Sequence, residues 1–66
     1  MSYYFKTISA NIWTDDSLIR GLPDDRRYWL WGYITDLETR GRLTTEEADE
    51  LRLNLWWVKR VPARHW

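Results

Sequence analysis

The chain of 66 residues has no cysteine, one histidine and three glycines, and its formal net charge is zero. The lack of cysteine excludes disulfides, thiolate metal sites and a cysteine nucleophile. The lack of net charge means that no overall electrostatic attraction draws the chain to nucleic acid or to an anionic membrane. Any function must therefore come from local patterns of side chains.

Long apolar stretches are also missing. No window approaches the roughly 18 apolar residues that a membrane span requires, and the first residues lack the apolar stretch of a signal peptide. A chain without cysteine is typical of a reducing compartment. We therefore expect a cytoplasmic protein without a membrane partner, folded as a single domain over residues 1–66.

Aromatic residues are what the chain has in excess. Six tryptophans, four tyrosines and one phenylalanine make up 17% of the residues. A domain this small has a limited core, and each of these rings is bulky. Some of the rings are therefore expected at the surface.

Helix start and stop signals predict a small all-α domain. Thr14 suits an N-cap and Gly21 the position after a helix end. Pro23 suits the start of a second helix, and Thr44 with Glu47 forms a capping box for a third. The short glycine-containing turn before Thr44 gives these last two helices a helix-turn-helix-like connection. The expected helices span residues 15–20, 24–40 and 45–59.

The two ends of the chain are expected to differ from the helices. Aromatic and β-branched residues over 3–8 favour an extended conformation, so residues 1–9 are predicted to form an extended arm or a short strand. Residues 62–66 interleave basic and aromatic side chains and are expected to form a tail after Pro62.

Apolar side chains at helical spacing predict the core. Residues three and four positions apart share one face of a helix. The stripe Leu30, Ile34 and Leu37 should therefore pack on the stripe Leu51, Leu55 and Val58, with Trp13, Leu18 and Leu22 closing one end.

The third helix has a second apolar face, which the core does not need. Leu53, Trp56, Trp57 and Arg60 repeat the helical spacing on the side away from Leu51. Exposed tryptophan and arginine are typical of protein interfaces. Three alternatives follow. The N-terminal residues, including Tyr4, cover this face, or the face pairs with a second copy of the chain, or it docks on a different protein.

Charge is distributed in blocks along the chain. Residues 43–50 carry four acidic and no basic side chains, and residues 51–66 carry four basic and no acidic ones. Acidic residues at the start of the third helix oppose its use as a DNA recognition helix, which presents its N-terminal residues to the bases. An alternative nucleic-acid contact would use arginines on a different edge or the basic end of the chain: Arg26, Arg27, Arg40, Arg42, Lys59 and Arg64.

No catalytic site is predicted. The only histidine, His65, is the penultimate residue, where side chains are usually mobile. The pairs Asp15/Asp16 and Asp24/Asp25 fit helix starts better than metal ligation. No glycine-rich phosphate loop is present. We therefore expect a non-enzymatic protein without a metal, a cofactor or a small-molecule substrate.

Two stretches resemble known families. The runs Ile8-Ser-Ala-Asn-Ile-Trp-Thr-Asp-Asp16 and Leu22-Pro-Asp-Asp-Arg-Arg-Tyr-Trp-Leu-Trp31 make residues 8–36 similar to the start of phage and plasmid replication-organiser proteins. The resemblance implies a phage or mobile-element origin and a helix-turn-helix-like arrangement. The chain departs from that winged-helix pattern in two ways. Its third helix begins with acidic residues, and no room is left after this helix for a two-stranded wing.

The second resemblance covers residues 37–52. Its run Gly41-Arg-Leu-Thr-Thr-Glu-Glu47 resembles the helical hairpin of short C-terminal oligomerisation domains. This resemblance implies interaction rather than catalysis. Together, the observations predict a small regulator, cytoplasmic and Trp-rich, that binds a protein partner or itself through Leu53, Trp56, Trp57, Arg60 and Tyr4.

Overall fold

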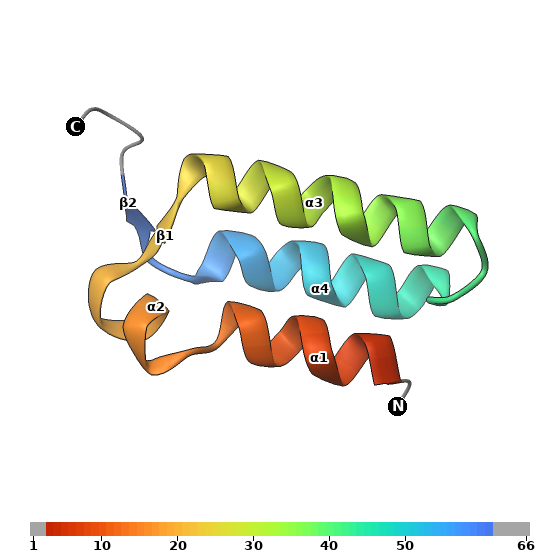
Figure 1. Ribbon diagram of the computed structural model, residues 1–66, viewed down its shortest axis with the longest axis horizontal. Helices are drawn as coiled ribbons and strands as arrows, with labels where there is room; N and C mark the ends of the chain where they lie inside the picture. The colour runs from red at the N-terminus through yellow and green to blue at the C-terminus, as the bar shows by residue number, and fades with distance from the viewer. Residues whose placement is uncertain (1–2, 62–66) are drawn as a thin grey trace.

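The computed structural model describes the backbone of residues 3–61 and the side chains of residues 3–59. Four helices and two very short strands follow one another along this described part of the chain, which confirms the small all-α fold (Figure 1). The elements are α1 (Tyr3–Ile12), α2 (Asp15–Arg20), β1 (Leu22–Pro23), α3 (Asp24–Thr39), α4 (Thr45–Trp57) and β2 (Arg60–Val61).

The prediction of an extended N-terminal segment over residues 1–9 was wrong for the described part, because residues 3–12 form helix α1. Phe5, Ile8 and Ile12 are buried on one side of α1, at a helical spacing of three and four residues. Their burial in the shared core outweighs the local preference of aromatic and β-branched residues for a strand. The tail predicted for residues 62–66 lies outside the described residues.

The three long helices run side by side, with α4 between α1 and α3 (Figure 1). The predicted stripes meet in one core, since every member of both is buried. Leu43, from the turn between α3 and α4, and the buried residues of α1 complete this core. Because α4 contacts a helix on each side, its remaining surface is the side that faces away from the core.

The predicted caps set most helix boundaries. Thr14 accepts a hydrogen bond from the backbone N–H of Ser17, and Thr44 accepts one from that of Glu47. Gly41 follows the end of α3 with φ +78°, a conformation that L side chains rarely adopt. Helix α4 ends at Trp57 rather than at residue 59, because Val58 is already extended.

The end of the core is closed differently from the prediction. Leu22 is buried as expected, but Trp13 and Leu18 are 40% and 58% exposed. The short helix α2 turns Ser17 inward instead, where its hydroxyl donates a hydrogen bond to the carbonyl of Ile12. That bond fixes which side of α2 faces the core and leaves Leu18 outside.

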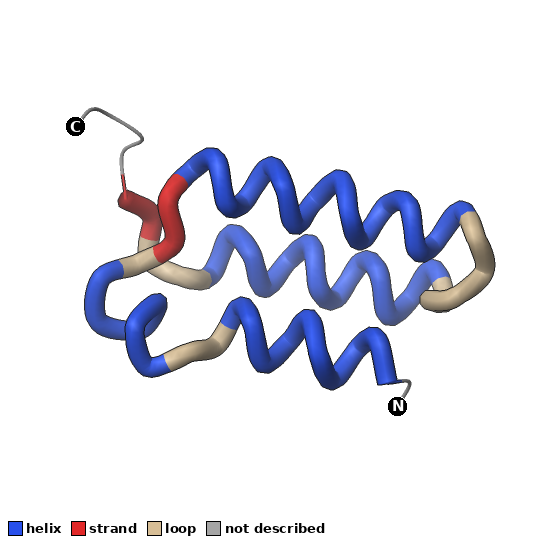
Figure 2. Tube along the Cα trace, in the orientation of Figure 1, coloured by secondary structure: helices blue, strands red, loops and turns tan. Residues whose placement is uncertain are grey.

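Two segments far apart in sequence pair at this end of the molecule. Strands β1 and β2 are parallel, with Leu22 opposite Arg60 and Pro23 opposite Val61, and they lie at one end of the long helices (Figure 2). The backbone N–H of Leu22 donates to the carbonyl of Lys59 at 2.7 Å. The chain after α4 is thereby joined to the chain before α3.

Candidate functional site

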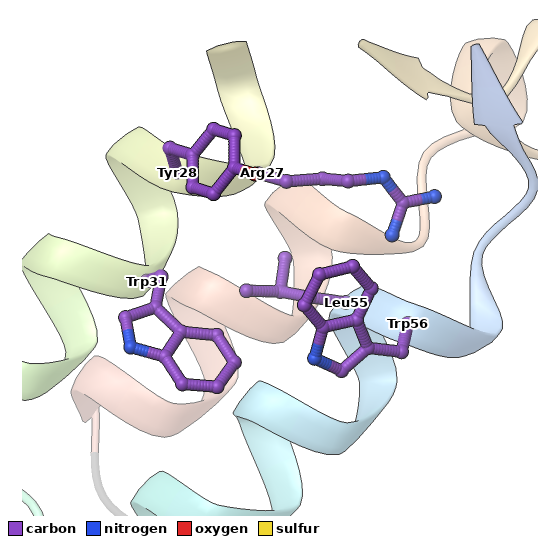
Figure 3. Close-up of a pocket in the computed structure, with 5 residues that line it drawn as sticks. All are labelled: Arg27, Tyr28, Trp31, Leu55 and Trp56. Carbon is purple, nitrogen blue, oxygen red and sulfur yellow. The ribbon is translucent and has the colours of Figure 1, made fainter. Parts of the chain in front are cut away.

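An aromatic cleft lies on the seam between α3 and α4. Its volume is about 280 Å³, and five residues line it: Arg27, Tyr28, Trp31, Leu55 and Trp56. The first turns of α3 supply one wall and the last turn of α4 supplies the other, with Leu55 between the two indoles (Figure 3). We call these five residues the aromatic cleft.

The two indole rings of the cleft hold each other in place. The centroids of Trp31 and Trp56 are 6.0 Å apart with an angle of 62° between the ring planes, which is an edge-to-face contact. Such pairs stabilise by about 0.5–1.5 kcal/mol beyond the area that they bury. The contact restrains both rings, yet Trp31 is still 40% and Trp56 50% exposed, so the pair is accessible from solvent.

Two arginines lie against these rings. The guanidinium carbon of Arg27 is 5.7 Å from the Trp56 centroid, and that of Arg52 is 5.7 Å from the Trp31 centroid. A cation over an indole face is attracted by the negative face of the ring. Each tryptophan is therefore restrained by its partner ring and by a cation.

Arg27 is a structural residue rather than a surface cation. It is 3% exposed, its Nε donates to the carbonyl of Leu22 at 3.3 Å, and its Nη2 donates to the carbonyl of Val58. These bonds join the start of α3 to β1 and to the first residue after α4. The expectation that Arg27 contacts nucleic acid was wrong, because its guanidinium is directed into the protein.

Arg52 connects the middle of α4 to α3. Its guanidinium donates to Thr35 at 3.2 Å, Glu38 at 3.0 Å and Asp49 at 2.8 Å. The hydrogen bond to Asp49 is the main cause that raises the pKa of Arg52 above its ordinary value, which further stabilises the charged form beside Trp31. The arrangement fixes the seam next to the cleft.

The residues predicted for partner binding are only partly brought together. Leu53, Trp56 and Trp57 are 58%, 50% and 73% exposed on α4. Trp56 leans toward α3, whereas Trp57 is not among the residues that line the cleft. The side chain of Arg60 lies outside the described part. The alternative in which the N-terminal residues cover Trp56 and Trp57 does not hold for the described chain, since both rings are exposed.

Tyr4 was wrongly grouped with those residues. It lies in the first turn of α1 and packs against the core cluster. The start of α1 and the end of α4 are at opposite ends of the long helices (Figure 1). Tyr4 is therefore not part of the surface that carries Trp56 and Trp57.

A separate aromatic pair lies elsewhere on α3. The rings of Trp29 and Tyr33 stack at 5.3 Å with 20° between their planes, and the guanidinium of Arg26 is 5.3 Å from the Trp29 centroid. Arg26 also reaches the side-chain oxygen of Asn11 in α1 at 3.5 Å. These contacts account for Trp29 and Arg26 without any ligand.

The remaining predicted nucleic-acid residues that the structure describes are spread over both ends of α3 and the end of α4. Arg26 and Arg40 are fourteen positions apart, which is about 21 Å along a helix. Arg40 pairs with Asp36 at 3.1 Å on the same helix, and Arg42 is exposed beyond the end of α3. Lys59 is exposed after α4, and Arg64 lies outside the described residues.

Among the described residues, no three histidine, cysteine or carboxylate side chains gather in a way that would hold a metal ion. No helix in the same part of the chain is long and apolar enough to cross a membrane.

Comparison with known proteins gives no match: no family model, no curated protein and no solved structure is significantly similar to this chain. The resemblances of residues 8–36 and 37–52 therefore stay predictions, as does the helix-turn-helix-like arrangement.

Sequence reasoning missed the cleft although it identified Trp56. Tyr28 and Trp31 are on one helix and Leu55 and Trp56 on another, and the predicted pairing of the two helices covered only their apolar core stripes, not the rings beside them. The available signal was that Trp31 borders the core stripe of its helix, as Trp56 does on the other. Two rings that border facing stripes meet across the seam.

Proposed function

We propose that this chain is a small non-enzymatic regulator that binds a protein partner through the exposed side of α3 and α4. The observation that carries the proposal is the aromatic cleft, in which ordered tryptophans remain half-exposed. The resemblance of residues 8–36 to replication-organiser proteins supports a phage or mobile-element origin as part of this proposal.

The exposed apolar side chains on this side form one binding surface. Leu53 and Trp57 continue on α4 from the cleft, and we call them together with Tyr28, Trp31 and Trp56 the aromatic face. Adjacent apolar residues of this size usually mark a contact site. Tryptophan, tyrosine and arginine are the residues whose truncation costs most at protein interfaces.

The chemistry of the cleft favours an apolar side chain as its occupant. Three rings and Leu55 line it, and the one charged residue, Arg27, donates to the carbonyls of Leu22 and Val58. Arg27 and Arg52 already lie against the Trp56 and Trp31 rings, so a further cation would meet like charges, and a small polar ligand would find few directional partners. Burial of apolar surface would supply most of the affinity.

Site-specific photo-crosslinking tests the proposal in cells that produce the chain. A photoreactive amino acid at Leu53 should yield adducts of discrete mass, whether the adduct is a second copy or another protein. The matched position is Ile19, which is 74% exposed on α2 and outside the aromatic face. We expect adducts from Leu53 and few from Ile19.

Trp56→Ala is the companion variant in this experiment. It removes one wall of the cleft from a half-exposed position, so the fold should persist and the Leu53 adducts should disappear. Equal adducts from Leu53 and Ile19, or adducts unchanged by Trp56→Ala, would contradict the proposal.

A further inference from the structure

We infer that the partner of the aromatic face is a second copy of this chain, with the two α4 helices antiparallel across a two-fold axis near Trp56. The inference rests on the proposed function, because it takes the aromatic face to be a binding surface. It adds the identity of the partner and the direction of the pairing.

The charges along α4 make its exposed side complementary to itself. Glu46 and Glu50 are exposed in the first half of the helix, and Lys59 is exposed just after its end. Between them lie the apolar residues Leu53 and Trp57. A surface that is acidic at one end, apolar next and basic at the other end matches a reversed copy of itself.

The helix rise sets the register within α4, so with the axis at Trp56 residue 57 of one copy faces position 55 of the other. Lys59 lies two residues beyond the end of α4, which places it beside about position 53. Glu50 lies one turn farther, about 4.5 Å along the helix. The flexible side chain of Lys59 covers that distance, and the two-fold axis repeats the contact.

A parallel pairing lacks this complementarity. It would place Glu46 beside Glu46 and Glu50 beside Glu50, and like charges at an interface oppose association. This repulsion favours the antiparallel direction.

The exposed area is sufficient for a modest dimer. With roughly 200 Å² for a fully exposed large side chain, the exposed fractions of the aromatic face amount to roughly 500–600 Å² per chain. Two facing copies would therefore hide roughly 1,000–1,200 Å², just above the area at which specific interfaces begin. We expect a dimer with a dissociation constant of about micromolar order.

Light scattering and sedimentation over a wide range of concentrations test the inference. The wild-type chain should change from monomer to dimer as its concentration rises, and Trp57→Ala should shift this transition to higher concentration. A wild-type chain that stays monomeric at about 100 μM would overturn the inference.

Charge variants test the direction of the pairing. Lys59→Glu should weaken the dimer by about tenfold, because it removes two symmetry-related exposed ion pairs. Lys6→Glu makes the same change of charge on α1, outside the aromatic face, and should change the dissociation constant much less. Adding Glu50→Lys to Lys59→Glu should restore most of the affinity.

The outcomes separate this inference from the proposed function. A monomeric wild-type chain with Leu53 adducts to another protein would overturn the second copy and support the proposed function. If Lys59→Glu and Lys6→Glu weaken the dimer equally, the antiparallel register is overturned. A dimer that neither Trp56→Ala nor Trp57→Ala weakens would overturn both.

Discussion

Gly32 and Gly41 are both exposed, yet a methyl group should have opposite effects at the two positions. Gly32 lies inside α3 and nothing approaches within 4 Å of the place where its Cβ would be. Alanine restricts the unfolded chain and favours a helix, so Gly32→Ala should raise the free energy of unfolding by about 0.5–1 kcal/mol. Urea denaturation followed by circular dichroism measures this change.

The control for that prediction is Gly41→Ala. Gly41 has φ +78°, where alanine is strained, and the same methyl group should lower the free energy of unfolding by about 1 kcal/mol. Equal effects at the two positions would show that φ at Gly41 does not determine the response.

Arg27 should be among the most sensitive polar residues of the chain. Arg27→Met keeps the apolar stem but removes the bonds to the carbonyls of Leu22 and Val58. We expect a loss of roughly 2–4 kcal/mol, because hydrogen bonds from a charged donor are lost and buried carbonyls lose their partner. Arg26→Met, at an exposed neighbouring position, should cost much less in the same denaturation experiment. Similar losses for both variants would contradict a structural role for Arg27.

The helices α2, α3 and α4 were predictable because their boundaries depend on local chemistry. Thr14 and Thr44 cap helix starts with hydrogen bonds that span only three residues. A cap that involves residues only three positions apart can be recognised from the sequence itself. The residues of helix α1 prefer a strand when considered locally.

The side chains that depend on tertiary contacts were not predictable in this way. Ser17 is buried and Trp13 is exposed, the reverse of what their polarity indicates. The burial of Ser17 depends on the carbonyl of Ile12, whose position is set by how α1 ends. The aromatic cleft likewise needs two helices to be placed before Trp31 and Trp56 meet.

Helix α1 should be indispensable to the fold rather than an accessory arm. Phe5 is 5% exposed in the core, so Phe5→Ala should lower the free energy of unfolding by about 3–5 kcal/mol. Tyr3→Ala changes a ring that is 74% exposed on the same helix and should fall within about 0.5 kcal/mol of wild type. Thermal unfolding of both variants measures the difference. A small effect of Phe5→Ala would mean that α1 is not part of the core.

The chain contains no cysteine, so a single introduced cysteine can report directly on how two whole molecules pair. A single cysteine near the two-fold axis, as in Trp57→Cys, should form a disulfide with its counterpart when a concentrated sample is oxidised. Glu46→Cys lies ten positions from the axis, so two such residues are about 30 Å apart in an antiparallel pair. Non-reducing electrophoresis should show the first cross-link and not the second. Efficient cross-linking through Glu46→Cys would indicate a parallel pair.

The connection that Arg27 and the β1–β2 pair make at one end of the molecule has a consequence for the order of folding. Arg27 and Val58 are 31 residues apart, whereas α3 and α4 meet through a short turn. Contacts between distant residues require a longer loop to close and tend to form late. Interactions absent from the transition state affect mainly the unfolding rate. The bonds of Arg27 should therefore form late in folding. They should slow the unfolding rate of the molecule more than they speed its folding rate.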